Sequence, residues 1–282
     1  MPETRRVGIV GWPLGYSLSP AIHQYWLHRL ETAGSYDSLP LKPENFEDDL
    51  ARLQSQGYCG FNITVPFKER VCPLLDRLTA QARRCGAANT IWQDRDGAWQ
   101  GDNTDGAGFS AALKQNRPDW QPGTGRVVIV GAGGAARGIL AVLKDAGQKD
   151  FALFNRTPER TARLEADFDL IDCMTGGLKD IDDVLNGDVS LLVNASTMGM
   201  KDENPFTPDL EKLPEDCPVF DAVYAPLETA LLRRARRRHL PVIDGLSMLM
   251  HQAAPAFARF FGHTPTVDQG LRDHILGLMQ DA

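Results

Sequence analysis

The stretch that decides the fold is Val127-Val-Ile-Val-Gly-Ala-Gly-Gly-Ala-Ala136, an apolar run that leads into a glycine-rich turn. Ile139, Leu140 and Leu143 follow at helical spacing, so the pattern predicts a strand, a tight turn and a helix. The first glycine permits the turn, and the second lets backbone approach a pyrophosphate bound by the free N–H groups of the helix start. Alanine is permitted at the third position of this motif. We therefore expect a Rossmann-like dinucleotide-binding domain.

The end of the next strand indicates which dinucleotide binds. Phe151–Phe154 is strand-like, Asn155-Arg-Thr157 follows it, and Arg160 lies one turn later. An NAD site needs Asp or Glu at the end of this strand to accept hydrogen bonds from the ribose 2′-hydroxyl. No acidic residue lies between Phe154 and Glu159. A guanidinium suits a 2′-phosphate because it donates two parallel charge-assisted hydrogen bonds. The sequence therefore favours NADP over NAD, with a plain surface role for Arg156 as the alternative.

The length and the alternation of elements predict an α/β protein of two domains. A single core stops growing beyond roughly 250–300 residues, and this chain has 282. Strand-like runs alternate with helical patterns on both sides of the glycine turn, which is typical of a parallel sheet covered on both faces. Arg117–Gly125 holds two prolines and two glycines, so we expect the linker there.

The composition excludes several classes of protein. No apolar run approaches the ~20 residues of a membrane span, and the N-terminal residues show no signal-peptide pattern. We therefore expect a cytoplasmic protein. The net charge of −7 argues against nucleic-acid binding. The five cysteines have neither metal-finger nor CxxC spacing, so we expect reduced thiols and no metal.

The N-terminal half carries small polar side chains around one lysine. Such groups in strand-end loops suit a small polyhydroxy acid, which needs donors and acceptors at fixed positions. Each residue alone has an ordinary explanation: Ser19, ahead of Pro20, is expected as a helix N-cap, Asp105 as another helix cap, and Lys68 as a surface cation. The residues are Ser17, Ser19, Asn62, Thr64, Lys68, Asn89 and Asp105.

Several motifs together resemble the shikimate dehydrogenase family over nearly the whole chain. Ahead of the glycine turn they are Ser17-Leu-Ser-Pro20, Asn62-Ile-Thr-Val-Pro-Phe-Lys68, Gly86-Ala-Ala-Asn-Thr90 and Gly101-Asp-Asn-Thr-Asp-Gly106. After it they are Asn155-Arg-Thr157, Asn194-Ala-Ser-Thr-Met-Gly-Met200, Asp221-Ala-Val-Tyr-Ala-Pro226 and Gly245-Leu-Ser-Met-Leu-Met-His-Gln252.

The resemblance implies two α/β domains with a cleft between them and NADP-dependent, reversible reduction of 3-dehydroshikimate to shikimate. This reaction belongs to chorismate and aromatic amino-acid biosynthesis. The last helices are expected to return to the first domain. The implied substrate domain comprises residues 1–108 and 245–282, and the implied NADP domain comprises residues 109–244.

The resemblance also assigns roles by matching position. Lys68 and Asp105 are the implied catalytic pair, and Ser17 with Ser19 is implied to hold the substrate carboxylate. The other implied substrate residues are Asn62, Thr64, Asn89, Tyr224 and Gln252, with Asp105 also contacting a ring hydroxyl. The implied cofactor residues are Gly131, Ala132, Gly133, Gly134, Ala135, Asn155, Arg156, Thr157, Arg160 and Met248.

Three positions depart from the family pattern, and two other functions remain open. Tyr16, Gln24 and Ser247 stand where histidine, asparagine and glycine are usual, which bears on shikimate against quinate. A catabolic quinate/shikimate dehydrogenase using NAD(P) is the first alternative, and Arg156 argues against its use of NAD. A non-catalytic nucleotide-sensing protein is the second, and it would lack Lys68 or Asp105. We expect a small-molecule substrate, no nucleic-acid or membrane partner, and a monomer or homodimer.

Replacing Arg156 by alanine tests the cofactor preference. One charge-assisted contact contributes about 1.5–3 kcal/mol, so the preference for NADP over NAD should fall by roughly tenfold to a hundredfold. Dissociation constants of both cofactors, measured by titration, check this. Equal losses for NADP and NAD would mean that the arginine only supports its loop.

Overall fold

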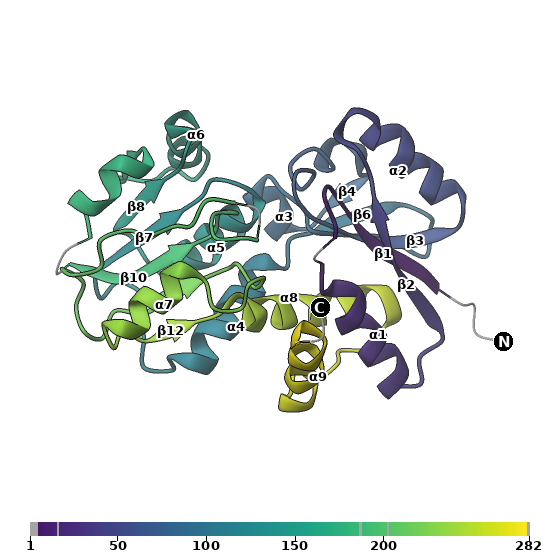
Figure 1. Ribbon diagram of the computed structural model, residues 1–282. Helices are drawn as coiled ribbons and strands as arrows, with labels where there is room; N and C mark the ends of the chain where they lie inside the picture. The colour runs from purple at the N-terminus through teal and green to yellow at the C-terminus, as the bar shows by residue number, and fades with distance from the viewer. Residues whose placement is uncertain (1–4, 16, 186–187, 202, 281–282) are drawn as a thin grey trace. The chain divides into compact units, whose positions relative to one another are not determined.

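The computed structural model describes residues 5–15, 17–185, 188–201 and 203–280. The chain folds as two compact units. Unit 1 comprises Met1–Thr104 and Met250–Ala282, and unit 2 comprises Asp105–Leu249. In Figure 1, unit 1 has the purple, blue and yellow parts of the chain, and unit 2 has the teal and green parts.

Unit 1 is built on a six-stranded mixed sheet in the order β2-β1-β3-β5-β6-β4. β1 pairs in parallel with β2 and β3, whereas β5 runs antiparallel to both β3 and β6. A tight turn at Asp96-Gly97 joins β5 and β6 into a hairpin, and Gly97 takes the positive φ of +86° that this turn requires. The strands are β1 (Arg5–Gly11), β2 (Gly34–Pro40), β3 (Tyr58–Ile63), β4 (Arg77–Leu78), β5 (Thr90–Gln93) and β6 (Trp99–Asp102).

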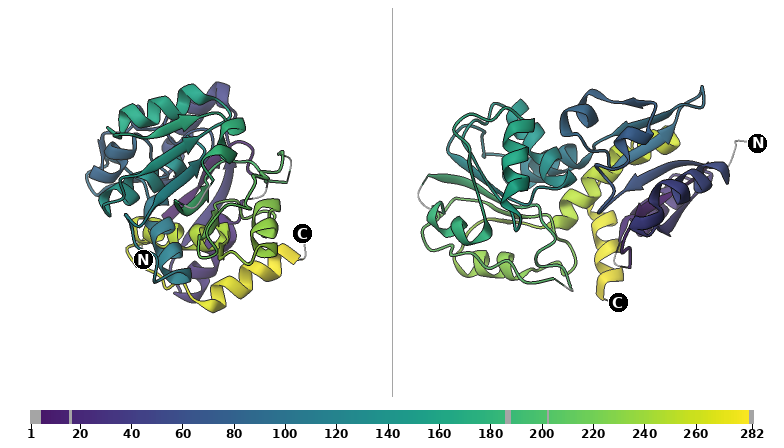
Figure 2. Two further views of the ribbon diagram at one scale, coloured as in Figure 1. Left: turned by 90° about the vertical axis from the view of Figure 1, so that its left-hand side faces the viewer. Right: turned by 90° about the horizontal axis from the view of Figure 1, so that it is seen from above.

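The helices of unit 1 come from both ends of the chain. α1 (Ser19–Arg29) contacts α9 (Gln269–Gln280), so the C-terminal segment packs on the first helix. The yellow helices in Figure 2 are α9 and α8 (Gly245–Phe261), whose residues from Met250 onward belong to unit 1. The remaining helices are α2 (Phe46–Ser55) and α3 (Ala80–Cys85), with short 3-10 turns at Pro43–Asn45 and Cys72–Leu74.

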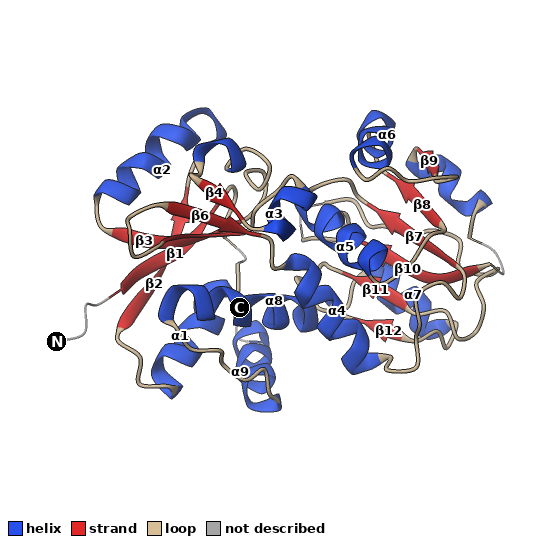
Figure 3. Ribbon diagram, turned by 180° about the vertical axis from the view of Figure 1, so that it is seen from behind, coloured by secondary structure: helices blue, strands red, loops and turns tan. Residues whose placement is uncertain are grey.

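Unit 2 is a parallel sheet in the order β12-β11-β10-β7-β8-β9 (Figure 3). β7 comes first in the chain and lies between β8 and β10, so the strand order reverses at the β7–β10 pair. Ligands bind outside the carboxyl ends of the strands at such a reversal. The strands are β7 (Arg126–Val130), β8 (Phe151–Phe154), β9 (Met174–Gly176), β10 (Val189–Asn194), β11 (Val219–Asp221) and β12 (Val242–Ile243).

Helices pack against this sheet around an apolar core. Val128, Val130 and Leu192 are fully buried, as the apolar runs predicted. Helices α4 and α5 contact each other extensively, because Gly106 lets α4 come close to the backbone of Gly138. The helices are α4 (Asp105–Asn116), α5 (Gly134–Asp145), α6 (Pro158–Asp167) and α7 (Ala230–Arg237), with a 3-10 turn at Leu178–Asp183.

Two local predictions are wrong. The proline- and glycine-rich segment 117–125 is not the linker, since the division between units falls at Thr104. The segment is a loop held inside unit 2, where the Trp120 indole donates to the Ser190 carbonyl at 2.9 Å. Ser19 is not the N-cap of α1 either, because Leu18 holds that position and Ser19 is the first helical residue. Within the described residues, no helix is long and apolar enough to cross a membrane.

His23 of α1 is buried among aromatic rings in unit 1. Its ring stacks on Tyr36 with centroids 4.1 Å apart, and Trp26, Phe257 and Phe260 complete the cluster. Within the part of the chain that the structure describes, neither ring nitrogen of His23 has a hydrogen-bond partner. Burial lowers the pKa of His23 to about 3, so the imidazole stays neutral in the folded protein.

His23 should therefore make stability depend on pH. In the unfolded chain its pKa is about 6.5, so the unfolded state gains a proton first as the pH falls. Stability is complete above that value and declines toward pH 3, by about 2 kcal/mol between pH 7 and pH 5. Urea unfolding of the wild type and of His23→Leu at both pH values measures this. The variant should lose less stability than the wild type when the pH falls from 7 to 5. An equal loss in both proteins would contradict the conclusion that His23 is held neutral in the folded state.

Candidate active site

The amide of Asn89, just before β5, is the centre of a buried polar network in unit 1. Its Nδ2 donates to Thr104 Oγ1 at 2.9 Å and to Gln252 Oε1 at 3.1 Å. Its Oδ1 accepts from the backbone N–H of Thr104 at 2.8 Å and from the Thr90 hydroxyl at 3.1 Å. These side chains are all buried. The network thus connects the start of β5 with Thr104, the last residue of the first segment of unit 1, and with Gln252 of α8.

Asn62 of β3 extends this network. Its Nδ2 donates to the Asn89 carbonyl and to Thr90 Oγ1, both at 3.1 Å, and its Oδ1 accepts from the Tyr36 hydroxyl at 2.7 Å. Phe61, Asn62 and Ile63 of this strand are all buried, so side chains on both faces of the sheet are covered here. The Asn62 amide is thus bonded by protein groups on both sides.

Lys68 follows β3 in a turn whose backbone is tied to its neighbours. The Lys68 carbonyl accepts from the N–H of Ala88 at 2.8 Å, next to Asn89. The Phe67 ring is fully buried and stacks on Phe46 at 4.0 Å, which anchors the turn. The Lys68 side chain itself is half-buried. The lysine is therefore held beside the segment that starts β5.

The other predicted residues of unit 1 follow parallel strands. Thr64, just after β3, donates its N–H to the Val10 carbonyl of β1 at 2.9 Å. Ser17 lies in the loop after β1, and its Oγ accepts from the N–H of the buried Ser19 at 3.4 Å. The carboxyl ends of β1 and β3 thus bring these loops to one edge of the sheet.

Three further predicted site residues, the catalytic Asp105, the substrate residue Tyr224 and the cofactor residue Met248, belong to unit 2. Asp105, the first residue of α4, is 4% exposed. Tyr224 is half-buried and Met248 is buried. Of the three departures from the family pattern, Gln24 donates to the Tyr36 carbonyl at 3.3 Å and Ser247 is buried. Tyr16 lies outside the described residues.

The glycine turn of unit 2 has the features that a dinucleotide needs. Gly131 has a φ of +112°, and a methyl group there would lie 2.7 Å from the Ala195 carbonyl oxygen, so only glycine fits. A methyl group at Gly133 would meet no described atom within 4 Å. Gly133 is also the N-cap of α5 and has no side chain to bond the first turn. The first backbone N–H groups of α5, beginning at Gly134 and Ala135, therefore donate no hydrogen bond to a capping side chain. Such N–H groups at a helix start suit the binding of a pyrophosphate.

The segment after β8 presents its basic residues on the surface of unit 2. Arg156, Thr157 and Arg160 are exposed, and Asn155 Nδ2 donates to the Thr157 carbonyl at 3.0 Å. Arg156 borders a hollow of about 330 Å³. These residues fit an anionic group placed beyond the glycine turn. Ala132, between the two glycines, is buried.

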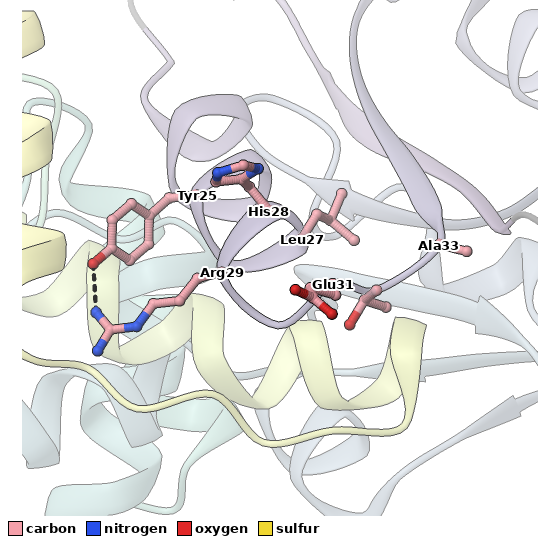
Figure 4. A pocket seen from close by; sticks show the side chains of 7 residues that line it. Tyr25, Leu27, His28, Arg29, Glu31 and Ala33 are labelled. Atoms are coloured by element: carbon pink, nitrogen blue, oxygen red, sulfur yellow. Dashed lines mark hydrogen bonds between the residues drawn. The ribbon is translucent and has the colours of Figure 1, made fainter.

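A second hollow lies away from all these residues. It has a volume of about 700 Å³, lies at the end of α1, and is bordered by Tyr25 and Arg29 (Figure 4). Arg29 donates to the Tyr25 hydroxyl at 2.6 Å and pairs with Asp268 at 3.1 Å. No predicted site residue borders this hollow. Among the described residues, no group of three or more His, Cys, Asp or Glu could hold a metal ion.

Some parts of the site were not predicted from the sequence. Thr90 and Thr104 were quoted within motifs without a role, although both bond Asn89. Tyr36 gave no signal, because residues 34–40 were not recognised as a strand. A buried asparagine with four hydrogen-bonding positions to satisfy was the only available hint.

The fold and these residues define a class of protein: a two-unit α/β oxidoreductase with a Rossmann-like dinucleotide unit. The family model of the shikimate dehydrogenase substrate-binding domain matches residues 9–91, and that of shikimate / quinate 5-dehydrogenase matches residues 114–199. A protein of Rhodospirillum rubrum named shikimate dehydrogenase (NADP(+)) is 44% identical over 277 residues, 98% of each chain. The chain belongs to the shikimate dehydrogenase family.

Further relatives and solved structures agree. A protein of Methylocella silvestris with the same name is 45% identical over 95% of this chain and 94% of its own. A shikimate 5-dehydrogenase of Thermus thermophilus, crystallised with NADP(H) and shikimate, has a TM-score of 0.83 and 34% identity, covering 97% of this chain and 99% of its own. A quinate dehydrogenase of Corynebacterium glutamicum with NAD has a TM-score of 0.85 and 30% identity, covering 97% and 99%.

Replacing Asn89 by leucine tests the buried network. Leucine has a similar size, but the Thr104 N–H and the Thr90 hydroxyl would each lose an acceptor. An orphaned buried donor costs about 1–3 kcal/mol. Urea unfolding should show this loss, whereas Asn45→Leu, at an exposed residue with no side-chain cap bond, should change stability little. Equal free energies of unfolding for the two variants would contradict a contribution of the Asn89 hydrogen bonds to stability.

Proposed function

We propose that this protein catalyses the reversible NADP-dependent reduction of 3-dehydroshikimate to shikimate, a step of chorismate and aromatic amino-acid biosynthesis, in the cytoplasm. The observation that carries the proposal is the 44% identity, over 98% of both chains, to a protein named shikimate dehydrogenase (NADP(+)). The polar network of unit 1 and the glycine turn of unit 2 support it. The protein acts as a monomer or a homodimer, on a small molecule and without a nucleic-acid or membrane partner.

Different substrate residues bind the carboxylate and the ring hydroxyls of the substrate. Ser17 and Ser19 bind the carboxylate through their short hydroxyl donors. Gln252 binds a ring hydroxyl, and its amide is orientated because Asn89 Nδ2 bonds its Oε1 at 3.1 Å. Thr64 contributes a further hydroxyl at the carboxyl end of β3. Asn62 acts mainly by holding the Asn89 backbone, since protein groups bond its amide.

The cofactor residues bind NADP through unit 2. Gly131 to Ala135 take the pyrophosphate at the start of α5, and Arg156 with Arg160 binds the 2′-phosphate. Bound NADP supplies the hydride donor or acceptor. Tyr224 and Met248 contact the substrate and the nicotinamide.

The proton is handled by Lys68. Reduction of a ketone develops negative charge on its oxygen, which must be stabilised and then protonated. Lys68 is the cation among the residues that match the family's catalytic positions, and Asp105 orientates it while binding a ring hydroxyl. In the oxidation direction the same lysine accepts the proton from the shikimate hydroxyl.

Lys68→Ala should lower kcat by roughly two to four orders of magnitude, the usual effect of losing a positioned acid–base group. KM for shikimate should change little, and NADP should still bind because its proposed residues lie in unit 2. Steady-state kinetics and a cofactor titration measure the two effects. Near-normal kcat would overturn this role of Lys68 without affecting family membership.

An absorbance assay at the reduced nicotinamide band tests the function itself. Shikimate and quinate are each offered with NADP⁺ and NAD⁺, and shikimate with NADP⁺ should give the highest kcat/KM. A quinate value equal to or above that for shikimate would favour a quinate dehydrogenase, which the likeness to the Corynebacterium glutamicum structure keeps as the second candidate. No turnover of either substrate would favour a non-catalytic nucleotide-binding protein.

A further inference from the structure

A buried acid at the carboxyl end of β11 has no part in the reaction described above. Asp221 is the last residue of that strand and is fully buried in unit 2. Its Oδ1 accepts from the Asn194 amide at 2.9 Å and from the N–H of Val223 at 3.0 Å. Its Oδ2 accepts from the Thr229 hydroxyl at 2.6 Å. All three donors are neutral groups.

The first of these bonds controls the loop after β10. Asn194 Nδ2 also donates to the Met198 carbonyl at 3.0 Å, and Asn194 Oδ1 accepts from the Ser196 N–H and hydroxyl. The next residue, Ala195, has the carbonyl that packs directly under Gly131 of the glycine turn. The Asp221 carboxylate thus orientates the side chain around which this loop folds.

The other two bonds fix the segment that follows β11. The N–H of Val223 immediately precedes Tyr224, a predicted substrate residue. Thr229 is the N-cap of α7, where its Oγ1 accepts from the N–H of Leu232 at 3.2 Å. The Asp221 carboxylate thus ties this segment on both sides of Tyr224, at Val223 and at Thr229.

Burial disfavours the charged form of the Asp221 side chain, yet the carboxyl group is ionised at neutral pH. Burial raises the pKa of Asp221 to about 6, against the three hydrogen bonds, which lower it. At pH 7.5 the side chain is therefore ionised. An ionised carboxylate accepts hydrogen bonds at both oxygens, whereas an asparagine of the same shape accepts at only one.

We propose that Asp221 is a positioning residue for catalysis, whose carboxylate fixes the segment carrying Tyr224 and the loop 194–198. The inference rests on the proposed function, because it assigns Tyr224 to the substrate. It names a residue outside the predicted catalytic, substrate and cofactor sets.

Asp221→Asn separates positioning from a merely structural role. The kcat/KM for shikimate should fall by roughly tenfold to a hundredfold, as for a small displacement of a positioning element. The Kd of NADP⁺ should change by less than about threefold, because backbone bonds hold the glycine turn, from Gly131 N to the Phe154 carbonyl and from Ala195 N to the Val130 carbonyl. The Tm at pH 7.5 should fall modestly, because asparagine accepts at only one atom and leaves a buried donor without an acceptor; activity is therefore compared well below the Tm of the variant.

The pH dependence gives a second readout. The groups that face the carboxylate from β10, α7 and the following segment are the Asn194 amide, the Thr229 hydroxyl and the Val223 N–H, none of which titrates. In the wild type, kcat/KM should therefore decline as the pH falls through about 6, where Asp221 takes up a proton. Asp221→Asn should lack this part of the decline.

Matched variants complete the test. Thr229→Ser keeps the hydroxyl donor and should retain wild-type kcat/KM, whereas Thr229→Val should lower it in the same direction as Asp221→Asn. Asp183→Asn, at an exposed residue of unit 2, should leave both kcat/KM and the acid decline unchanged. Wild-type kcat/KM in Asp221→Asn, or equal values for the two Thr229 variants, would overturn the proposal. A wild type inactive with shikimate would instead overturn the proposed function.

Discussion

The constraint on which unit 1 depends is the need to satisfy one buried amide. Asn89 is 2% exposed, and its partners come from β5, from Thr104 and from Gln252, which lie far apart in the chain. A buried polar group without partners is costly, so these segments must come together for the unit to fold. A separate backbone bond, from the Ala88 N–H to the Lys68 carbonyl, holds the lysine turn after β3 beside the start of β5. The bonds of Asn89 thus fix the position of Gln252 and Thr104, and the neighbouring backbone bond fixes that of the lysine turn.

The constraint in unit 2 is different, because its proposed role requires backbone that can come close to the pyrophosphate of NADP. The strand order reverses between β7 and β10, so the loops after these two strands begin side by side, with Val130 opposite Asn194. Gly131 turns sharply because the Ala195 carbonyl occupies the space of a side chain. The Ala195 carbonyl therefore lies against the glycine turn, and the backbone bond from the Ala195 N–H to the Val130 carbonyl keeps it there.

How much the sequence predicts depends on whether the signal is local. The strand Val127–Val130, its glycine turn and the helix after it were predicted because each has a characteristic local pattern. The strand Gly34–Pro40 was missed, since glycine, serine, aspartate and proline weaken strand periodicity, and pairing with β1 supplies what the pattern lacks. The linker was misplaced because proline and glycine at 117–125 mark turns, whether or not a domain ends there. The partners of Asn62 are cross-strand neighbours, which no single sequence window contains.

Two buried ionisable groups show why burial alone does not identify function. His23 and Asp221 are both fully buried, and desolvation favours the neutral form of each. For His23 that form is the one present at neutral pH, so the imidazole packs among aromatic rings much as an apolar ring would, with no hydrogen bond from its nitrogens to any described residue. Asp221 differs, because a pKa of about 6 leaves it ionised at neutral pH and three donors converge on it. The first group can be replaced by a hydrocarbon of similar size without orphaning any neighbour. The second cannot, because three segments of unit 2 would each lose an acceptor, and this asymmetry marks Asp221 as a residue that organises its surroundings.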